Sequence, residues 1–474
     1  MDKVHGPSEM FANLFKIPEL RKKALFTLLI LAVYRFGSNI PVPGIDTVAF
    51  TQIFREQQQG SWVYGFLGVY NALSAGNLFD FTIFSLGIMP YISAEIIFQL
   101  LTKVVPQLEE IQKEGQSGQR RIRMYSRIAT IPICILQAIF TINLLTSRPE
   151  LAATIIIEPE WLFQVIAVIT MTAGCYFLIW LGDQITEKGI GNGVSLLIQA
   201  GIIASIPNAV ISLMQPMLDS KVDPQASLDA FLSLVTLVVM FTAITAGVVI
   251  ITLARREIVI QHAKHVRGSK VAGGQRQTFP LRIDQAGVIP IIFASALMTL
   301  PLILFGLLEQ VGAGGGFWGN LMTDAKDAMN QSGFSYTLGY IVLIFFFTYF
   351  WTQLQFNPIE LAKNFKEWGA FIPGVRPGKD TVTYLSQILR RMTLAGATFL
   401  CLVAVVPVMI PEAMHFVFGD SESLSQNRMF FRFMGGTGIL IVVHVALDLI
   451  QKIEVQLIQR NYDAYTGMVG QRRR

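Results

Sequence analysis

The chain has 474 residues, of which 52% are hydrophobic and only 15% are charged. This composition is too apolar for a soluble bundle of buried helices and favours a membrane protein. The formal net charge of +5 by itself suggests a nucleic-acid partner, but the basic residues gather in alternate gaps between apolar stretches and so follow the rule for membrane insertion.

Ten apolar stretches follow one another along the chain, and each has about the 17 to 25 residues that a tilted helix needs to cross a bilayer. The stretches cover residues 24–40, 79–102, 128–146, 161–182, 192–213, 228–253, 285–307, 336–356, 392–410 and 434–456. We therefore predict an all-α fold, a polytopic membrane protein with ten transmembrane helices.

The distribution of lysine and arginine predicts the orientation of these helices. The N-terminal tail, the even-numbered gaps and the C-terminal tail are basic, whereas the odd-numbered gaps hold only Arg55, Arg148, Lys221, Lys326, Arg428 and Arg432. Because basic loops remain on the cytoplasmic side of a membrane, both termini are predicted to be cytoplasmic. Residues 1–23 lack the short apolar core and cleavage site of a signal peptide and fit a short amphipathic helix on the membrane surface.

The chain contains an internal repeat. Gly87–Ala94, in the second stretch, resembles Gly287–Ala294, in the seventh, with Gly, Pro, Ile and Ala at the same offsets. These stretches are equivalent members of two five-helix halves, and because five is an odd number, the second half is inverted relative to the first around a central pore. A chance match of so short a motif is the alternative. The predicted domains are an N-terminal half 1–213, an outer hinge loop 214–227, a C-terminal half 228–456 and a cytoplasmic tail 457–474.

Ionisable side chains inside the stretches are few, and the least expected are Glu95, His444 and Asp448. His444 and Asp448 are spaced i, i+4, which allows either a shared proton or separate interhelical hydrogen bonds. These residues leave open a second class of function, an inverted-repeat secondary transporter coupled to protons. No paired carboxylates, nucleophile–base pair, phosphate loop or metal cluster has a usable spacing, so the sequence predicts neither an enzyme nor a cofactor.

Five motifs resemble the SecY family of protein-conducting channels. They comprise residues 34–44, 87–94, 189–193, 287–290 and 371–378, and several motifs in one order are far more specific than any one of them. The resemblance extends from about residue 12 to about residue 460. It implies the central channel subunit of the general secretory translocase, which passes unfolded secretory polypeptides across the bacterial inner membrane and releases hydrophobic segments sideways into lipid.

The resemblance implies a pore with a seal in its middle. In this family a ring of aliphatic side chains narrows the channel, and the matching positions are Ile88, Ile92, Ile198, Ile292 and Ile441. A narrow apolar ring holds water and ions poorly but offers a passing polypeptide no sequence-specific hydrogen bonds. Taken without the family motif, isoleucines in apolar helices are usually core or lipid-facing residues.

The family's plug is matched by residues 64–77, a glycine-rich segment that is too short to span the membrane. Its small residues, which keep its contacts shallow and its displacement easy, are Gly65, Gly68, Ala72, Ser74 and Gly76. A re-entrant segment with no gating role is the alternative.

The resemblance also implies a lateral gate, formed by the second and third helices against the seventh and eighth. Its matching positions are Pro90, Gln99, Asn192 and Pro290. The prolines either let these helices bend as the halves part or are ordinary packing kinks. Gln99 and Asn192 are expected to hold the closed gate together by hydrogen bonds of about 1 kcal/mol.

Two cytoplasmic gaps, 254–283 and 357–391, are unusually long and basic. Orientation alone explains their sign, but in the family such loops dock the SecA ATPase and the phosphates of ribosomal RNA. The matching residues here are Arg255, Arg256, Lys264, Arg267 and Arg376.

The remaining partners also follow from the resemblance. They are the small membrane subunits SecE and SecG, signal sequences, unfolded secretory proteins and membrane lipid. Since the chain shows no nucleotide site, SecA or a translating ribosome must supply the driving force. Two departures from the family are Glu95 and His444, which stand where small or aliphatic residues are expected, and the glycine-rich outer gap 308–335 is poorly matched.

Overall fold

The computed structural model is mostly helical. It describes residues 17–46, 49, 78, 81–146, 159–218, 224–262, 265–267, 270–272, 276–295, 297–298, 334–418 and 437–471. Contacts divide the chain into two compact units, one of Met1–Ser212 with Val445–Arg474 and the other of Leu213–His444. Each unit has its own buried core.

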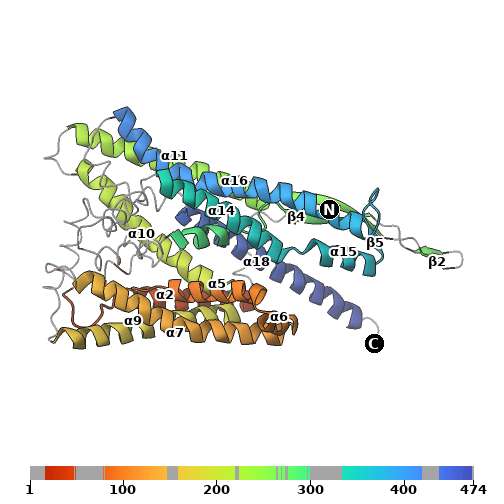
Figure 1. The fold of residues 1–474 in the computed structure, drawn as a ribbon, viewed down its shortest axis with the longest axis horizontal. Helices are drawn as coiled ribbons and strands as arrows, with labels where there is room; N and C mark the ends of the chain where they lie inside the picture. Colours follow the sequence, from red (N-terminus) through yellow and green to blue (C-terminus); the bar gives the residue numbers. More distant parts are fainter. Residues whose placement is uncertain are drawn as a thin grey trace, which may run out of the picture. The chain divides into compact units, whose positions relative to one another are not determined.

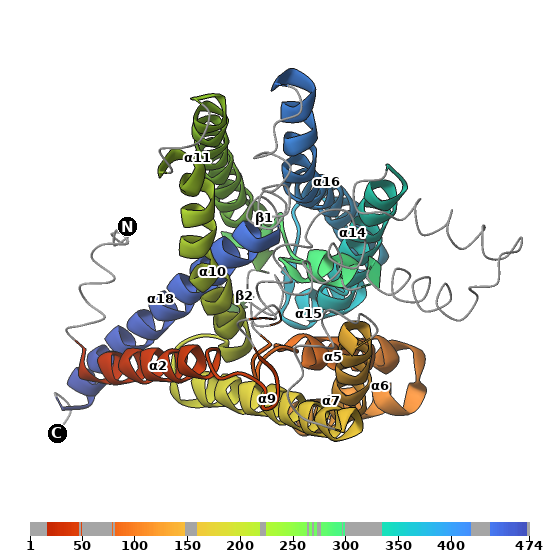
Figure 2. The same ribbon diagram turned by 90° about the vertical axis from the view of Figure 1, so that its left-hand side faces the viewer.

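The first unit is a layer of helices. Its helices are α2 (Pro18–Gly37), α5 (Met89–Val104), α6 (Pro106–Lys113), α7 (Gln116–Thr146), α9 (Glu160–Lys188), most of α10 (Gly193–Leu218) and the C-terminal part of α18 (Thr437–Gln471). α5 packs on α7, α7 on α9, and α9 on α2, and α2 runs beside α9 in Figure 2. Phe81, Phe84, Phe163 and Met171 are fully buried between these elements.

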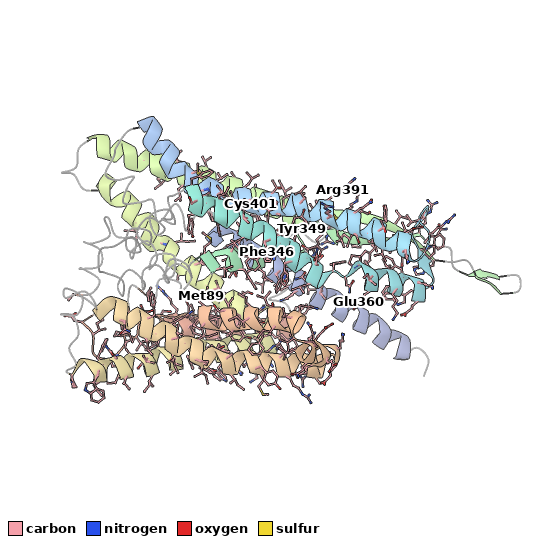
Figure 3. The ribbon with its side chains drawn as sticks, in the orientation of Figure 1. Met89, Phe346, Tyr349, Glu360, Arg391 and Cys401 are labelled. Carbon is pink, nitrogen blue, oxygen red and sulfur yellow. The ribbon has the colours of Figure 1, made fainter. Side chains whose placement is uncertain are left out.

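The second unit combines helices with short strands. Its helices are α11 (Pro224–Leu253), α14 (Phe334–Gln355), α15 (Pro358–Glu367) and α16 (Lys379–Phe418). α16 packs on α14 and α11. Figure 3 labels Tyr349 on α14 and Cys401 on α16, where the Tyr349 hydroxyl donates to the Arg390 carbonyl at 3.5 Å and the Cys401 thiol donates to the Ile341 carbonyl at 3.9 Å.

The strands lie at one end of this unit, beside α15 (Figure 1). β1 (Arg255–His262) pairs antiparallel with β4 (Arg276–Arg282) and with β5 (Ala370–Phe371), and β2 (His265–Arg267) pairs with β3 (Lys270–Ala272). The all-α prediction is therefore incomplete. Exposed and buried residues alternate in β1 around Ile258 and Ile260, and this period of two is typical of a strand. The prediction considered only the basic residues of this gap and missed the alternation.

The membrane prediction is confirmed in its coarse form. Among the described residues, five helices are long and apolar enough to cross a membrane: Gln116–Asn143, Trp161–Lys188, Leu234–Leu253, Phe334–Glu367 and Lys379–Pro407. Helical residues also occur in the other five stretches, so the ten-span plan stays a prediction for those stretches. The predicted hinge loop 214–227 overlaps the end of α10 and the start of α11, which leaves residues 219–223 between them.

The second stretch was predicted to be helical from residue 79, and this was wrong. The helix begins at Met89, and residues 81–88 form buried turns, because Thr82 pairs with Pro41 and Gly87 has a φ of 58°. An apolar run can be a buried helix or a buried irregular segment, and composition does not distinguish the two.

Candidate functional site

The two copies of the internal repeat have the same local backbone. We call residues 81–94 the first corner and residues 281–294 the second corner. Gly87 and Gly287 have φ values of 58° and 61°, and in each corner a helix begins two residues later, with Pro90 or Pro290 in its first turn. Glycine adopts positive φ readily and proline suits the first turn of a helix, so the recurring residues account for the recurring shape.

The correspondence continues upstream of the sequence motif. Ile83 N donates to the Ile40 carbonyl at 3.0 Å, just after α2, and Ile283 N donates to the Ala254 carbonyl at 3.0 Å, just after α11. Antiparallel pairing accompanies both bonds, as the bridge Pro41↔Thr82 in the first corner and as the β1–β4 ladder in the second. Each corner is thus bonded to the chain just after a helix, α2 in the first corner and α11 in the second.

Each corner also contacts a later helix through a glycine. A Cβ at Gly174 of α9 would overlap the carbonyl oxygen of Ile83, and a Cβ at Gly396 of α16 would lie 3.2 Å from the carbonyl oxygen of Ile283. These glycines were not predicted. A glycine that receives a carbonyl leaves no periodic signal in a sequence, so nothing in the sequence pointed to them.

The corners bury most of their side chains but not all. Phe81, Leu281, Ala94 and Ala294 are fully buried, whereas the two isoleucines at the same offset, Ile92 and Ile292, are only half-buried. Each corner therefore keeps the isoleucine at this offset partly accessible at the start of its helix.

The other three candidate pore positions differ in how deeply they are buried. Ile198 of α10 is half-buried, while Ile88 and Ile441 are 5% and 3% exposed. Ile88, Ile92 and Ile198 belong to the first unit, and Ile292 and Ile441 to the second. Their arrangement as a ring stays a prediction.

The candidate gate residues have local partners. Pro90 and Pro290 are buried at the starts of their helices. The Gln99 carbonyl accepts from the Thr102 hydroxyl at 2.7 Å. Asn192 is exposed, and its Oδ1 accepts from Val194 N at 3.2 Å at the start of α10, an N-cap bond that supports the helix.

Two sets of predicted residues lie outside what the structure describes. The first set is the plug segment 64–77, which includes Gly65, Gly68, Ala72, Ser74 and Gly76. The second set is Lys264 and the side chain of Arg267. Both stay predictions.

The two basic gaps fold together as one body, which we call the platform. β1 from the first gap pairs with β5 from the second through Gln261↔Phe371 and His262↔Ala370. Beneath them is a shared hydrophobic core of Ile258, Ile260, Leu281, Ala362, Phe365, Ala370, Ile372, Leu385, Ile388 and Met392. Arg255, Arg256 and Arg376 are exposed on this body. The sequence predicts these arginines on two separate loops. The pairing of β1 with β5 instead joins the two loops into one folded body.

Polar side chains also join the helices of the first unit. Arg127 of α7 bonds Asp183 of α9 at 2.6 Å, and the Tyr176 hydroxyl donates to the Arg127 carbonyl. Glu95 of α5 interacts electrostatically with Arg123 and Arg127. The unexpected carboxylate is thus accompanied by cations. Within the described residues no group of three His, Cys, Asp or Glu side chains is placed to hold a metal ion.

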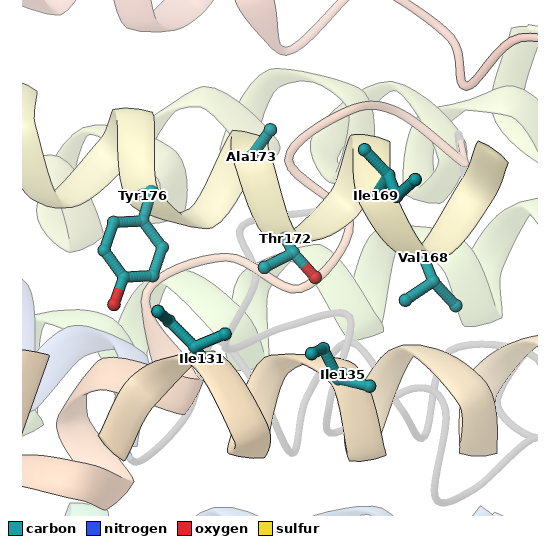
Figure 4. A pocket seen from close by; sticks show the side chains of 7 residues that line it. All are labelled: Ile131, Ile135, Val168, Ile169, Thr172, Ala173 and Tyr176. Carbon is teal, nitrogen blue, oxygen red and sulfur yellow. The ribbon is translucent and has the colours of Figure 1, made fainter. Parts of the chain in front are cut away.

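An apolar groove of about 380 Å³ lies between α7 and α9 (Figure 4). It is lined by Ile131, Ile135, Val168, Ile169, Thr172, Ala173 and Tyr176. Both helices are long and apolar enough to cross a membrane, so this surface suits hydrocarbon and has no catalytic groups.

Comparison with known proteins gives a consistent result. A family model described as SecY matches residues 82–450. The chain is 37% identical to a protein translocase subunit SecY of Thermotoga maritima over 96% of this chain and 97% of the relative, and 39% identical to one of Streptomyces coelicolor over 96% and 99%. It is also similar in fold to a solved protein-conducting channel, with a TM-score of 0.56, 17% identity and coverage of 94% and 97%. A Sec61 channel in a canine ribosome–channel complex gives a TM-score of 0.54, 16% identity and coverage of 94% and 97%.

Proposed function

The chain belongs to the SecY family, and from this premise we propose how it works as the channel subunit of a protein translocase. It passes unfolded secretory polypeptides across the bacterial inner membrane and releases hydrophobic segments sideways into lipid. The observation that carries the proposal is the pair of corners, each of which begins a helix with a partly accessible isoleucine.

The two corners support a plan of two inverted five-helix halves with ten spans. Each corner bonds to the end of the first helix of its half and contacts a glycine of the fourth, α9 or α16. An internal duplication explains why backbone contacts recur at the same offsets, and an odd number of spans in each half inverts the second copy. Both termini then lie in the cytoplasm, as the basic loops require.

In this plan the corner isoleucines contribute to an apolar ring. Ile92 and Ile292 stand at equivalent positions, and Ile88, Ile198 and Ile441 complete the set. A ring of this kind seals the closed channel because narrow apolar walls exclude water and ions. The segment 64–77 covers the ring as a plug, and Pro90, Gln99, Asn192 and Pro290 belong to the lateral gate.

The platform is the docking surface for cytoplasmic partners. Its exposed Arg255, Arg256 and Arg376 stand on a common core, and guanidinium groups bind phosphates well because they present several donors in a fixed plane. The ribosome, through ribosomal RNA, and SecA are the partners proposed here, with Lys264 and Arg267 also contributing. SecE and SecG complete the membrane assembly.

Crosslinking to an arrested secretory chain tests the ring. The variants are Ile88→Cys, Ile92→Cys, Ile198→Cys, Ile292→Cys and Ile441→Cys. Matched controls are Ile97→Cys and Ile203→Cys, each 46% exposed and five residues beyond a ring position on the same helix, which turns them about 140° away. Crosslinks at the ring positions and not at the controls are expected. Equal crosslinking at the controls, or none at the ring, would overturn the proposal.

The rival transporter is tested by the ionisable residues it needs. The Asp448 carboxylate is bonded to Lys452 at 2.8 Å, so it is already engaged by a cation on its own helix. Glu95→Gln and Asp448→Asn should leave the export of secretory proteins intact in a channel. A proton-coupled transporter would instead lose its activity.

A further inference from the structure

The glycine turn of the second corner is held by ionisable side chains at the place where a main-chain carbonyl closes the turn of the first. The Gly87 N–H donates to a backbone group, the Phe84 carbonyl, at 2.8 Å. The corresponding Gly287 N–H donates to a side chain, Asp284 Oδ1, at 2.9 Å. The same turn is therefore closed by a fixed carbonyl in one corner and by an ionisable carboxylate in the other.

A histidine lies on the other side of this turn. The His444 ring of α18 packs against Gly287 so closely that a Cβ there would be 3.0 Å from Nε2 and 3.1 Å from Cε1. His444 is half-buried and interacts electrostatically with Asp284. An imidazole and a carboxylate thus hold the turn that leads to Pro290 and Ile292.

We propose that His444 is a positioning residue for the channel: through Asp284 and Gly287 it sets where the helix that carries Ile292 begins, and it does so most firmly when its ring is protonated. This inference deepens the proposed function and rests on it. His444 departs from the aliphatic or small residue expected at its position, and the proposal gives that departure a role.

Two charged groups act on Asp284, namely His444 of α18 and Arg282 at the end of β4. Asp448, one turn after His444 on α18, is bonded to Lys452. A carboxylate attracts a protonated imidazole far more than a neutral one. The clamp is therefore strongest where His444 is protonated and Asp284 is ionised, and it weakens when either charge is lost.

Alkylation of a single engineered cysteine measures the position of the helix. Ile292→Cys and, as the matched control, Ile92→Cys are each placed in the assembled translocase in membrane vesicles, and their reaction rates with a small maleimide are compared. The chain without either change gives the background of the three buried native cysteines. The ratio of the two rates removes the ordinary effect of pH on thiol reactivity.

In the unaltered corner the ratio should change with pH, because the charges on His444 and Asp284 depend on pH. His444→Gln, which keeps the size and a hydrogen-bonding group of the ring, and Asp284→Asn should each shift the ratio by on the order of threefold to tenfold and flatten its pH profile. The double variant should shift the alkylation ratio no more than either single variant, because both substitutions remove the same interaction.

A ratio that stays unchanged in His444→Gln and Asp284→Asn would overturn the inference, and so would shifts that add in the double variant. The measurement needs no translocating substrate. If the substrate fails to crosslink to the ring, the proposed function is contradicted, but the alkylation result still stands. If the alkylation ratio is unchanged, the role of His444 is contradicted, but the proposed channel function is not.

Discussion

The two corners share a backbone and differ in what holds it. The first is fixed by main-chain groups, by close packing of Ile83 against Gly174, and by the uncharged side chains of Thr82 and Ser85. The second is fixed by side chains, since Asp284 closes the turn and His444 packs on Gly287. Gln355, with its amide oriented to satisfy both groups, also donates to the Gln285 carbonyl at 2.8 Å and accepts from Trp351 Nε1 at 2.7 Å. A corner held by uncharged groups responds to added bulk, whereas one held by a carboxylate and an imidazole responds also to charge.

The corners differ further in how far their pairing extends. In the first it is the isolated bridge Pro41↔Thr82, while in the second it continues for seven residue pairs, from Arg255↔Arg282 to Gln261↔Arg276. The longer ladder forms β1 and β4 and so builds the platform. The same helix–corner connection therefore leads to a short turn in one unit and to a folded surface with exposed arginines in the other.

The largest effect is expected from adding a methyl group at the corner glycines. Gly174→Ala would overlap the Ile83 carbonyl, and such overpacking should cost about 3 kcal/mol or more. In Gly396→Ala the methyl lies 3.2 Å from the Ile283 carbonyl, and the better helix propensity of alanine, worth about 1 kcal/mol, offsets the strain.

Thermal unfolding in detergent and the amount of protein in the membrane measure both changes. Gly339→Ala is the control, because its methyl would lie at an ordinary 3.5 Å from Met298. Equal loss in Gly174→Ala and Gly396→Ala would show that the two corners are packed alike.

The next largest effect concerns the glycines with positive φ. Gly87→Ala and Gly287→Ala should each cost about 1 to 2 kcal/mol for the backbone conformation alone. The Gly287 variant should cost more, because its methyl meets the His444 ring at 3.0 Å. Adding His444→Ala should recover that excess in the Gly287 variant and nothing in the Gly87 variant, as measured by a double-mutant cycle on unfolding. Recovery in both would mean that His444 acts on the whole protein.

A smaller effect is expected from Gln355→Ala in the second corner. It leaves Trp351 Nε1 and the Gln285 carbonyl without this partner, at a cost of about 1 kcal/mol. The unfolding midpoint measures the loss. Gln355→Glu serves as the comparison, since its carboxylate can accept from Trp351 but cannot donate to Gln285, and it should recover part of the loss at most.

The smallest effect is expected at the half-buried isoleucines. Ile92→Val and Ile292→Val should each cost less than about 0.5 kcal/mol, whereas Ile291→Val, at a fully buried position, should cost about 1 kcal/mol. Unfolding of the three variants side by side tests the burial pattern. A clearly larger loss at Ile292 than at Ile92 would contradict the equivalence of the two positions.

Much of the local structure follows from the local sequence. Long apolar runs separated by basic gaps required membrane helices, and the recurrence of glycine and proline at Gly87, Pro90, Gly287 and Pro290 required similar turns, because few residues adopt positive φ or begin a helix so readily. The family motifs likewise identified the corner isoleucines from residue types alone.

Tertiary structure decided the rest. The contacts of Ile83 with Gly174 and of Ile283 with Gly396 join main-chain atoms to glycines, which have no side chain to reveal a pattern. The pairing of β1 with β5 and the approach of His444 to Gly287 bring together segments about a hundred residues or more apart. Such contacts depend on how whole helices and strands pack, and the free energy that selects them comes from burying many side chains at once, which no local stretch of sequence contains.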